Sequence, residues 1–142
     1  MKIHSVSIFF FAHETEDSSK ILDSVVKCIP GLSLNDFSAE FLEGHHGNRI
    51  GLFRASVTSP RAKEVFQGTI SSMDKADIVY LLSTLDNRLE KNRLHIRVDK
   101  QALIAECKPR IKDGDDVVKI QVSLAATKDE LKAELSKIAQ DG

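Results

Sequence analysis

The chain has 142 residues, 42% of them hydrophobic and 29% charged, and a formal net charge of −1 at pH 7. These values predict one domain, residues 1–142, that can bury a core without disulfide bonds, and they exclude a disordered or fibrous chain. The small net charge excludes a uniform polycation. However, residues 88–112 hold eight basic and three acidic side chains, so one basic face is expected.

The segment Ile3–His13 is rich in β-branched and aromatic residues and predicts the first strand. Its alternation places the even-numbered residues from Val6 to Phe10 on one face. Phe9 and Phe11 indicate that the other face is covered too. We therefore expect the phenylalanine cluster in the core, and the sequence shows no aromatic platform for single-stranded RNA.

A helix is predicted next, with Thr15 as its N-cap and Pro30-Gly31 at its end. Two alternating runs, 36–44 and 49–57, then flank a short turn that contains two adjacent histidines. This pattern is typical of a β-hairpin.

Further helices and strands are predicted in the second half of the chain. Pro60 starts a helix that runs to about Ser72, and Asp74 starts another. Alternation over Leu94–Cys107, with the apolar run Val117–Ala125 after it, predicts the late strands.

A capping box of Thr127 and Glu130 predicts a short C-terminal helix, about residues 128–140, as an appendage to the domain. The element order is then β-α-β-β-α(α)-β-β-β-α. Hairpin-like connections dominate this order. They predict an α+β fold of two layers, a mostly antiparallel sheet with helices packed on one face.

The two cysteines, Cys28 and Cys107, form no CxxC pair. This pattern supports neither a zinc ribbon nor a disulfide framework, so we expect two inert packing residues in a reduced, cytoplasmic protein. The apolar run Val6–Ala12 has no cleavage site and is far shorter than a bilayer span. No signal peptide and no membrane partner are predicted.

The adjacent His45 and His46 raise the question of a metal or catalytic site, which Glu43, His13 and Asp99 would have to complete. Zinc sites need three or four converging ligands, and adjacent side chains on a strand point apart. We therefore predict no metal, no cofactor and no catalytic residue here.

Two other interpretations of the turn Gly44–Arg49 stay open. As a structural turn, it would use Gly44 and Gly47 for positive φ angles. As an RNA contact, it would use both histidine rings, the amide of Asn48 and the guanidinium of Arg49.

The segment Arg97–Gln101 is the second candidate for an RNA contact. Arg97, Lys100 and Gln101 offer contacts to phosphates and base edges, and Asp99 would orient the arginine. A solvated sheet edge, on which Arg97 and Asp99 pair with each other, is the alternative.

The motifs Phe11–Asp17, Glu43–Ile50 and Leu94–Leu103 together resemble an archaeal RNA-binding-domain family described as predicted exosome subunits. The similarity spans roughly residues 3–124. It implies a fold like that of the ribosomal protein that binds 5S rRNA, and a link to RNA processing. The motif positions that carry over are His13, Thr15, Glu16, the turn Gly44–Arg49, Arg97, Asp99, Lys100 and Gln101.

We therefore predict a non-enzymatic RNA-binding protein associated with RNA processing or the exosome. RNA is its expected partner, with RNA-processing or ribosomal proteins and a homodimer as further options. One alternative is a protein-interaction or scaffolding subunit that does not contact RNA. A second alternative is a metal-dependent hydrolase or nuclease.

Overall fold

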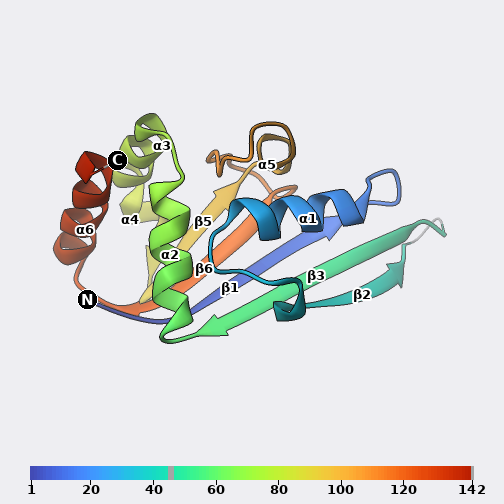
Figure 1. The fold of residues 1–142 in the computed structure, drawn as a ribbon, viewed down its shortest axis with the longest axis horizontal. Coiled ribbons are helices and arrows are strands. Elements are labelled where there is room, and N and C mark those ends of the chain that lie inside the picture. Colours follow the sequence, from blue (N-terminus) through green and yellow to red (C-terminus); the bar gives the residue numbers. More distant parts are fainter. Residues whose placement is uncertain (45–46, 142) are drawn as a thin grey trace.

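The computed structural model describes residues 1–44 and 47–141. Its strands form one antiparallel sheet in the order β2-β3-β1-β6-β5-β4, and the helices pack on one face of it (Figure 1). The predicted two-layer α+β class is thus confirmed. The strands are β1 (Lys2–Ala12), β2 (Phe37–Glu43), β3 (Arg49–Thr58), β4 (Leu89–Glu90), β5 (Arg93–Val98) and β6 (Val118–Ala125). The helices are α1 (Ser18–Cys28), α2 (Arg61–Ser71), α3 (Lys75–Ser83), α4 (Leu85–Arg88), α5 (Lys100–Glu106) and α6 (Lys128–Asp141), with a 3-10 turn η1 (Leu34–Asp36).

The core lies between the helices and one face of the sheet. β1 is a central strand, and its residues Val6, Ile8 and Phe10 are all buried there, as predicted. The ring of Phe10 stacks on Phe53 of β3 with 4.9 Å between centroids. Replacing one fully buried phenylalanine of this kind with alanine costs about 3–5 kcal/mol of stability, so this face fixes the register of the sheet.

The opposite face of β1 is only partly buried, and the expectation that it is covered is wrong. Phe9 and Phe11 lie there, and each retains solvent exposure. Because one layer of helices covers one face of a sheet, these rings shield each other instead, edge to face at 4.8 Å. We call this second surface the open face.

The first helix begins two residues later than predicted. Asp17, and not Thr15, is the N-cap of α1, and its carboxylate accepts a hydrogen bond from the backbone N–H of Lys20 at 3.2 Å. Its apolar stripe buries Ile21 and Val25 against the sheet.

The predicted hairpin and the predicted starts of the later helices are confirmed. β2 pairs with β3 in antiparallel register, so the two runs flank one turn. Pro60 precedes α2, and Asp74 precedes α3. In α6, Thr127 and Glu130 form the predicted capping box with side chain to backbone distances of 3.0 and 3.1 Å. That helix packs against α2 and α3 and buries Leu131.

The prediction of a continuous strand over Leu94–Cys107 is wrong beyond Val98, because α5 follows β5 after one residue. Asp99 ends the strand and caps the helix, since its carboxylate accepts a hydrogen bond from Gln101 N at 3.3 Å. The helix then buries Leu103 against the core.

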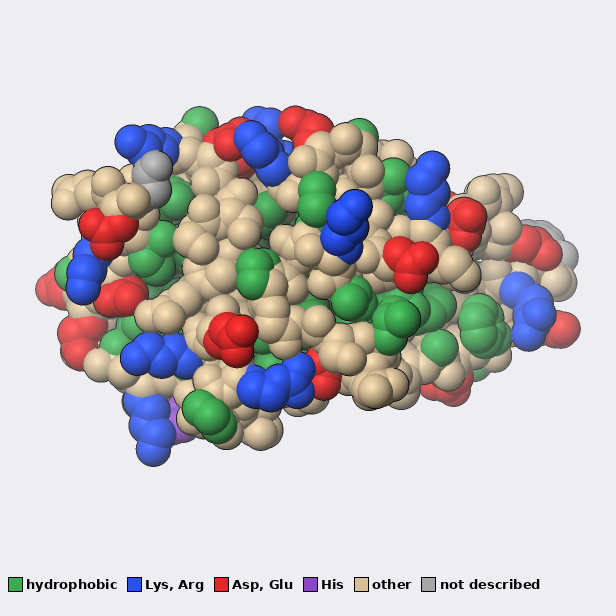
Figure 2. All heavy atoms as spheres, viewed as in Figure 1, with side chains coloured by type: hydrophobic (Ala, Val, Ile, Leu, Met, Phe, Trp, Pro, Cys, Tyr) green, Lys and Arg blue, Asp and Glu red, His purple; other side chains and the backbone are tan. Residues whose placement is uncertain are grey.

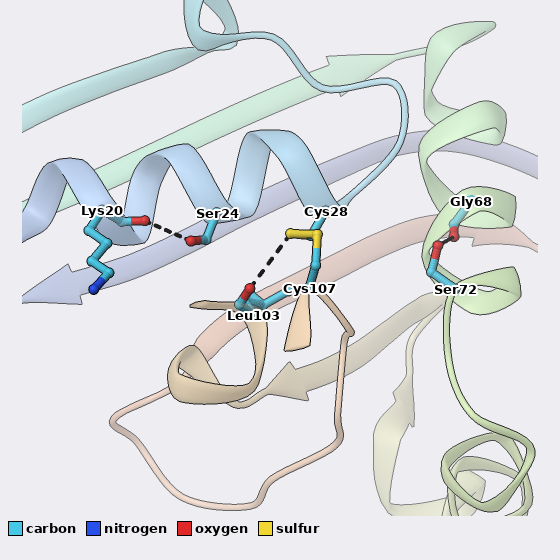
Figure 3. The surroundings of a disulfide bond; sticks show 7 residues. All are labelled: Lys20, Ser24, Cys28, Gly68, Ser72, Leu103 and Cys107. Carbon is cyan, nitrogen blue, oxygen red and sulfur yellow. Dashed lines mark hydrogen bonds between the residues drawn. A yellow bond between two sulfur atoms is a disulfide. The ribbon is translucent and has the colours of Figure 1, made fainter. Parts of the chain in front are cut away.

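The two cysteines form a disulfide, which contradicts the prediction of two reduced residues. Cys28 at the end of α1 is bonded to Cys107, which caps α5 in the left-handed region at φ 54° (Figure 3). Cys28 Sγ also lies 3.6 Å from the carbonyl oxygen of Leu103. A bonded sulfur has no proton to donate, so this is a packing contact. The cysteines therefore give no argument for a reducing compartment.

Among the residues that the structure describes, no helix has both the length and the apolar run that a membrane crossing requires.

The disulfide joins residues 79 positions apart, so it restricts the unfolded chain strongly. For a loop of this length, the chain-entropy model gives about 4.5 kcal/mol of stabilisation. We expect the free energy of unfolding of the Cys28→Ser variant to be lower than that of the oxidised protein by up to this amount. The variant should therefore unfold at a lower urea concentration. Urea unfolding of the variant and of the protein with and without reductant checks this. Equal midpoints for oxidised and reduced protein would contradict it.

Candidate nucleic-acid interface

A row of four side chains crosses the open face, one from each of four neighbouring strands. In the sheet register, Arg54 of β3 pairs with Phe9 of β1, Phe9 pairs with Lys119 of β6, and Lys119 pairs with Arg97 of β5. Paired residues of adjacent strands point to the same face, so the four lie in line. We call them the cationic row. It places three cations and one aromatic ring on the sheet face opposite the main helix layer.

The aromatic ring of the row is held between neighbours. The guanidinium carbon of Arg54 lies 4.8 Å from the centroid of the Phe9 ring, and Phe11 packs against the same ring from its edge. Two residues further along the same strands, Gln121 of β6 pairs with His95 of β5 in the sheet register. Both side chains retain exposure. The open face thus combines cations, rings and hydrogen-bonding groups.

Two cations of the row stand directly opposite each other. Arg97 and Lys119 are paired across β5 and β6, and like charges at this spacing lower the stability of a sheet. Their compensation is weak. Arg97 Nη1 donates to the carbonyl oxygen of Gly114 at 3.1 Å, and Lys119 Nζ lies 3.9 Å from the carboxylate of Asp115, which is 92% exposed. An anion bound between the two cations would relieve their repulsion.

The helix-covered face has a different charge pattern. Lys, Arg, Asp and Glu side chains are interspersed there, with hydrophobic side chains between them (Figure 2). Several of these charges pair with each other, such as Arg61 with Asp36 at 2.6 Å and Lys108 with Asp74 at 2.9 Å. The hydrogen bond from Arg61 holds the pKa of Asp36 below its ordinary value. This face therefore offers no single-sign patch to a polyanion.

Gly44, Gly47, Asn48 and Arg49, the described residues of the predicted turn, lie at the end of the β2–β3 hairpin (Figure 1). His45 and His46 lie outside the residues that the structure describes. The turn closes by a hydrogen bond from Gly44 N to Asn48 O at 2.6 Å. The positive φ is at Gly47 (77°) and not at Gly44.

Arg49, next to the turn, faces away from the cationic row. It pairs with Glu43, and its guanidinium carbon lies 5.1 Å from the Phe41 ring centroid. Arg49 is five residues along β3 from Arg54, and β5 lies three strands further across. Standard sheet spacing then separates Arg49 from Arg97 by about 16 Å along the strands and about 14 Å across them. The two segments predicted as one RNA surface are not neighbours.

Lys100 is 3% exposed, so it does not form the surface contact expected of it. Its Nζ lies 3.2 Å from Glu16 Oε1 and 2.6 Å from Asp116 Oδ1. The hydrogen bond from Lys100, its charge and that of His13 hold the pKa of Asp116 below its ordinary value. Gln101 is exposed in the first turn of α5. The ammonium of Lys100 is already neutralised inside the protein.

His13, Glu16 and Asp116 have the donor atoms of a possible metal site, all within 4.8 Å of one another. The Lys100 ammonium, however, binds both carboxylates and supplies the positive charge that a metal would bring. A divalent cation would have to displace a buried lysine. Asp99, which the metal hypothesis also used, caps α5 instead. This cluster is therefore better described as an ion-pair network than as a metal centre.

Sequence reasoning missed Phe9, Arg54 and Lys119. A signal was present, because each stands at an alternate position between buried neighbours in its strand. That alternation shows which residues share a face, but it does not show that this face is uncovered.

An antiparallel sheet with an open cationic face is one of the surfaces on which proteins bind nucleic acids. The chain belongs to a family whose model is described as RNA binding and matches residues 5–124.

The chain is also similar to two relatives and to two solved structures. The chain is 31% identical over 123 residues to the uncharacterized protein MJ0213 of Methanocaldococcus jannaschii, covering 82% of this chain and 81% of that protein. It is 28% identical over 132 residues to RNA-binding protein PAB1135 of Pyrococcus abyssi, covering 89% and 84%. The structure resembles protein SSO0741 of Sulfolobus solfataricus, a DUF54 protein, with TM-score 0.84, 27% identity and coverage of 96% and 98%. Protein AF2318 of Archaeglobus fulgidus shares the fold, with TM-score 0.75, 21% identity and coverage of 96% and 99%.

The burial of Lys100 gives a prediction that separates stability from binding. Lys100→Met keeps the apolar stem and removes the ammonium, which leaves Glu16 and Asp116 facing each other. We expect the free energy of unfolding to fall by about 2 kcal/mol, less than for a fully enclosed pair because water reaches Asp116. The exposed neighbour is the control, since Gln101→Ala should change stability by less than about 0.5 kcal/mol. Urea unfolding of both variants measures this, and equal effects would refute the buried network.

Proposed function

We propose that this protein is a non-enzymatic RNA-binding protein that holds RNA on the open face of its sheet. The observation that carries this proposal is the cationic row, in which Arg97 and Lys119 stand opposed with weak compensation and Phe9 lies beside them. Membership in a family described as RNA binding supports the same conclusion. A phosphate group between the two cations would convert a repulsion into two charge-assisted contacts.

The open face favours single-stranded RNA over a duplex. Unpaired bases can stack on Phe9 and Phe11, whose rings are partly exposed, and Arg54 adds a guanidinium plane beside them. Gln121 and His95 offer hydrogen bonds to base edges one line further along the sheet. In an A-form duplex the bases are already stacked and paired, so only the phosphate contacts would remain.

The hairpin tip is proposed as a second, separate contact. His45, His46, Asn48 and Arg49 would meet an RNA strand only where it continues past the end of the sheet, and Gln101 would add a polar contact at α5. Lys100 is left out of this proposal because its ammonium already binds the carboxylates of Glu16 and Asp116.

The chemistry of the row supports a binding role. Arginine, lysine and phenylalanine side chains bind and stack, but they include no carboxylate pair and no activated nucleophile. We therefore propose that RNA leaves this surface unchanged, and that the protein acts in the cytoplasm as an accessory factor in RNA processing.

Mutation of the open face tests the proposed function. With a labelled single-stranded RNA of twelve nucleotides, we expect Phe9→Ala to weaken binding about tenfold, since each stacked base contributes about 1–3 kcal/mol. Arg97→Ala combined with Lys119→Ala should weaken binding and reduce the slope of log K against log salt by about 0.7 per lost phosphate contact. Fluorescence anisotropy at several salt concentrations measures both effects.

The matched controls are two exposed lysines on helices of the covered face, Lys63→Ala and Lys132→Ala. Both should bind like the unmodified protein, and a duplex of the same sequence should bind more weakly than the single strand. An unchanged salt slope in the double variant, or equal losses in the controls, would remove the open face from consideration.

The proposed link to the exosome has its own test. Tagged protein purified from its own cells should retain exosome subunits before RNase treatment, and subunits that remain afterwards would be direct protein partners. The purified protein incubated with labelled RNA and Mg²⁺ should leave the RNA intact. Absence of exosome subunits in both samples would reject the link, and cleavage would reject the non-enzymatic role.

A further inference from the structure

A cleft of about 510 Å³ adjoins the open face at its β5 edge. Its walls come from α3, α4, the short strand β4, β5 and the loop before β6. His95 and Arg97 line the cleft and also belong to the open face, so the two surfaces are continuous. The cleft is lined by Tyr80, Thr84, Asn87, Arg88, Glu90, His95, Arg97 and Asp113.

Arg88 is a buried cation in the wall of this cleft, 7% exposed. Its Nε donates to Thr84 Oγ1 at 2.7 Å, its Nη2 donates to Asp113 Oδ1 at 3.2 Å, and its guanidinium carbon lies 5.4 Å from the Tyr80 ring centroid. Apart from the Tyr80 hydroxyl, with which the guanidinium interacts, no hydrogen-bond acceptor among the described residues faces Nη1. The Arg88 side chain lines the cleft and keeps a small exposed area there. One donor of a fixed guanidinium is thus available to a ligand.

The loop at Asp113-Gly114 holds the polar groups of the cleft in place. Tyr80 donates from its hydroxyl to Asp113 Oδ2 at 2.8 Å, while Arg88 occupies the other carboxylate oxygen. The hydrogen bonds from Tyr80 and Arg88 keep the pKa of Asp113 below its ordinary value, so the carboxylate stays charged at neutral pH. The carbonyl oxygen of Gly114 accepts from Arg97. Both arginines are therefore positioned before any ligand arrives, which lowers the entropy cost of binding.

We propose that this cleft is a nucleotide subsite, which takes one nucleotide of an RNA strand lying on the open face, with its phosphate at Arg88 and Arg97. The inference rests on the proposed function. A volume of about 510 Å³ lies within the usual range of roughly 300–1,000 Å³ for small-ligand sites. Tyr80, which is 42% exposed, offers ring surface to the base.

The charged groups of the subsite favour a phosphodiester-linked ribonucleotide over a nucleoside triphosphate and over a deoxyribonucleotide. Two carboxylates, Glu90 and Asp113, balance the two arginines, so the cleft has no excess positive charge. A single phosphodiester contacts the arginines at a lower electrostatic cost than a triphosphate would, because the triphosphate brings several negative charges close to the carboxylates. Both carboxylate oxygens of Asp113 already accept hydrogen bonds, one from Tyr80 and one from Arg88. Glu90 is exposed, and its carboxylate can accept a hydrogen bond from a ribose 2′-hydroxyl, which DNA lacks. The subsite is therefore expected to favour RNA over DNA.

Binding of a nine-nucleotide single-stranded RNA and of the DNA with the same sequence tests this subsite. We expect the intact protein to prefer RNA, and Glu90→Gln to reduce the RNA-to-DNA affinity ratio about tenfold, because a neutral amide oxygen accepts a weaker hydrogen bond than a carboxylate does. Glu64→Gln on the exposed side of α2 is the matched control and should leave the ratio unchanged. Arg88→Lys keeps the charge but loses the planar fork, and should weaken RNA binding.

Amide NMR spectra of the unmodified protein provide a readout that needs no variant, in case Arg88→Lys fails to fold. The RNA should shift the amide signals of Asn87, Arg88 and Asp113, and those of the open face. If RNA binds and Phe9→Ala weakens it, but the cleft signals and the Glu90→Gln ratio do not change, the subsite is rejected while the open face stands. If no RNA binds, the proposed function fails and the subsite fails with it.

Discussion

The structure depends on β1, which has two neighbours in the sheet and two chemically different faces. On one face, Val6, Ile8 and Phe10 pack against the helices and fix the register with β3 and β6. That register then determines which side chains meet on the other face. A shift of one residue would expose the core and bury the cations, so the core that stabilises the fold also aligns Arg54, Phe9, Lys119 and Arg97.

Regions outside the core hold the edges of this surface in place. The Cys28–Cys107 disulfide joins the ends of α1 and α5, and Lys100 at the start of α5 binds carboxylates from two further segments. The loop between α5 and β6, which carries Asp113 and Gly114, is therefore anchored where it leaves α5 and where it meets the sheet. Asp113 and Gly114 of this loop bind Arg88 and Arg97, respectively. Because the loop is anchored at both ends, the two arginines of the cleft are held in fixed positions.

Local signals in the sequence predicted the elements that local forces determine. The hairpin, the proline-led helix and the Thr127–Glu130 capping box depend on neighbours a few residues away, and all are present. The disulfide was missed because 79 positions separate its cysteines. α5 was missed because the alternation of β5 continues into it, and only the cap at Asp99 marks the change. The burial of Lys100 and the exposure of Phe9 follow from tertiary packing, which no local pattern contains.

The near-neutral charge of the whole chain is compatible with RNA binding once charges are assigned to faces. On the helix-covered face, acidic and basic side chains pair with each other and cancel. On the open face, the described residues give the cationic row one ion pair, between Lys119 and the exposed Asp115. Exposed charges act within roughly 8 Å at physiological salt, so a ligand senses the local row and not the net charge. A long-range field would attract any polyanion. A local row of cations beside Phe9 instead binds most tightly a strand that supplies phosphates and bases together.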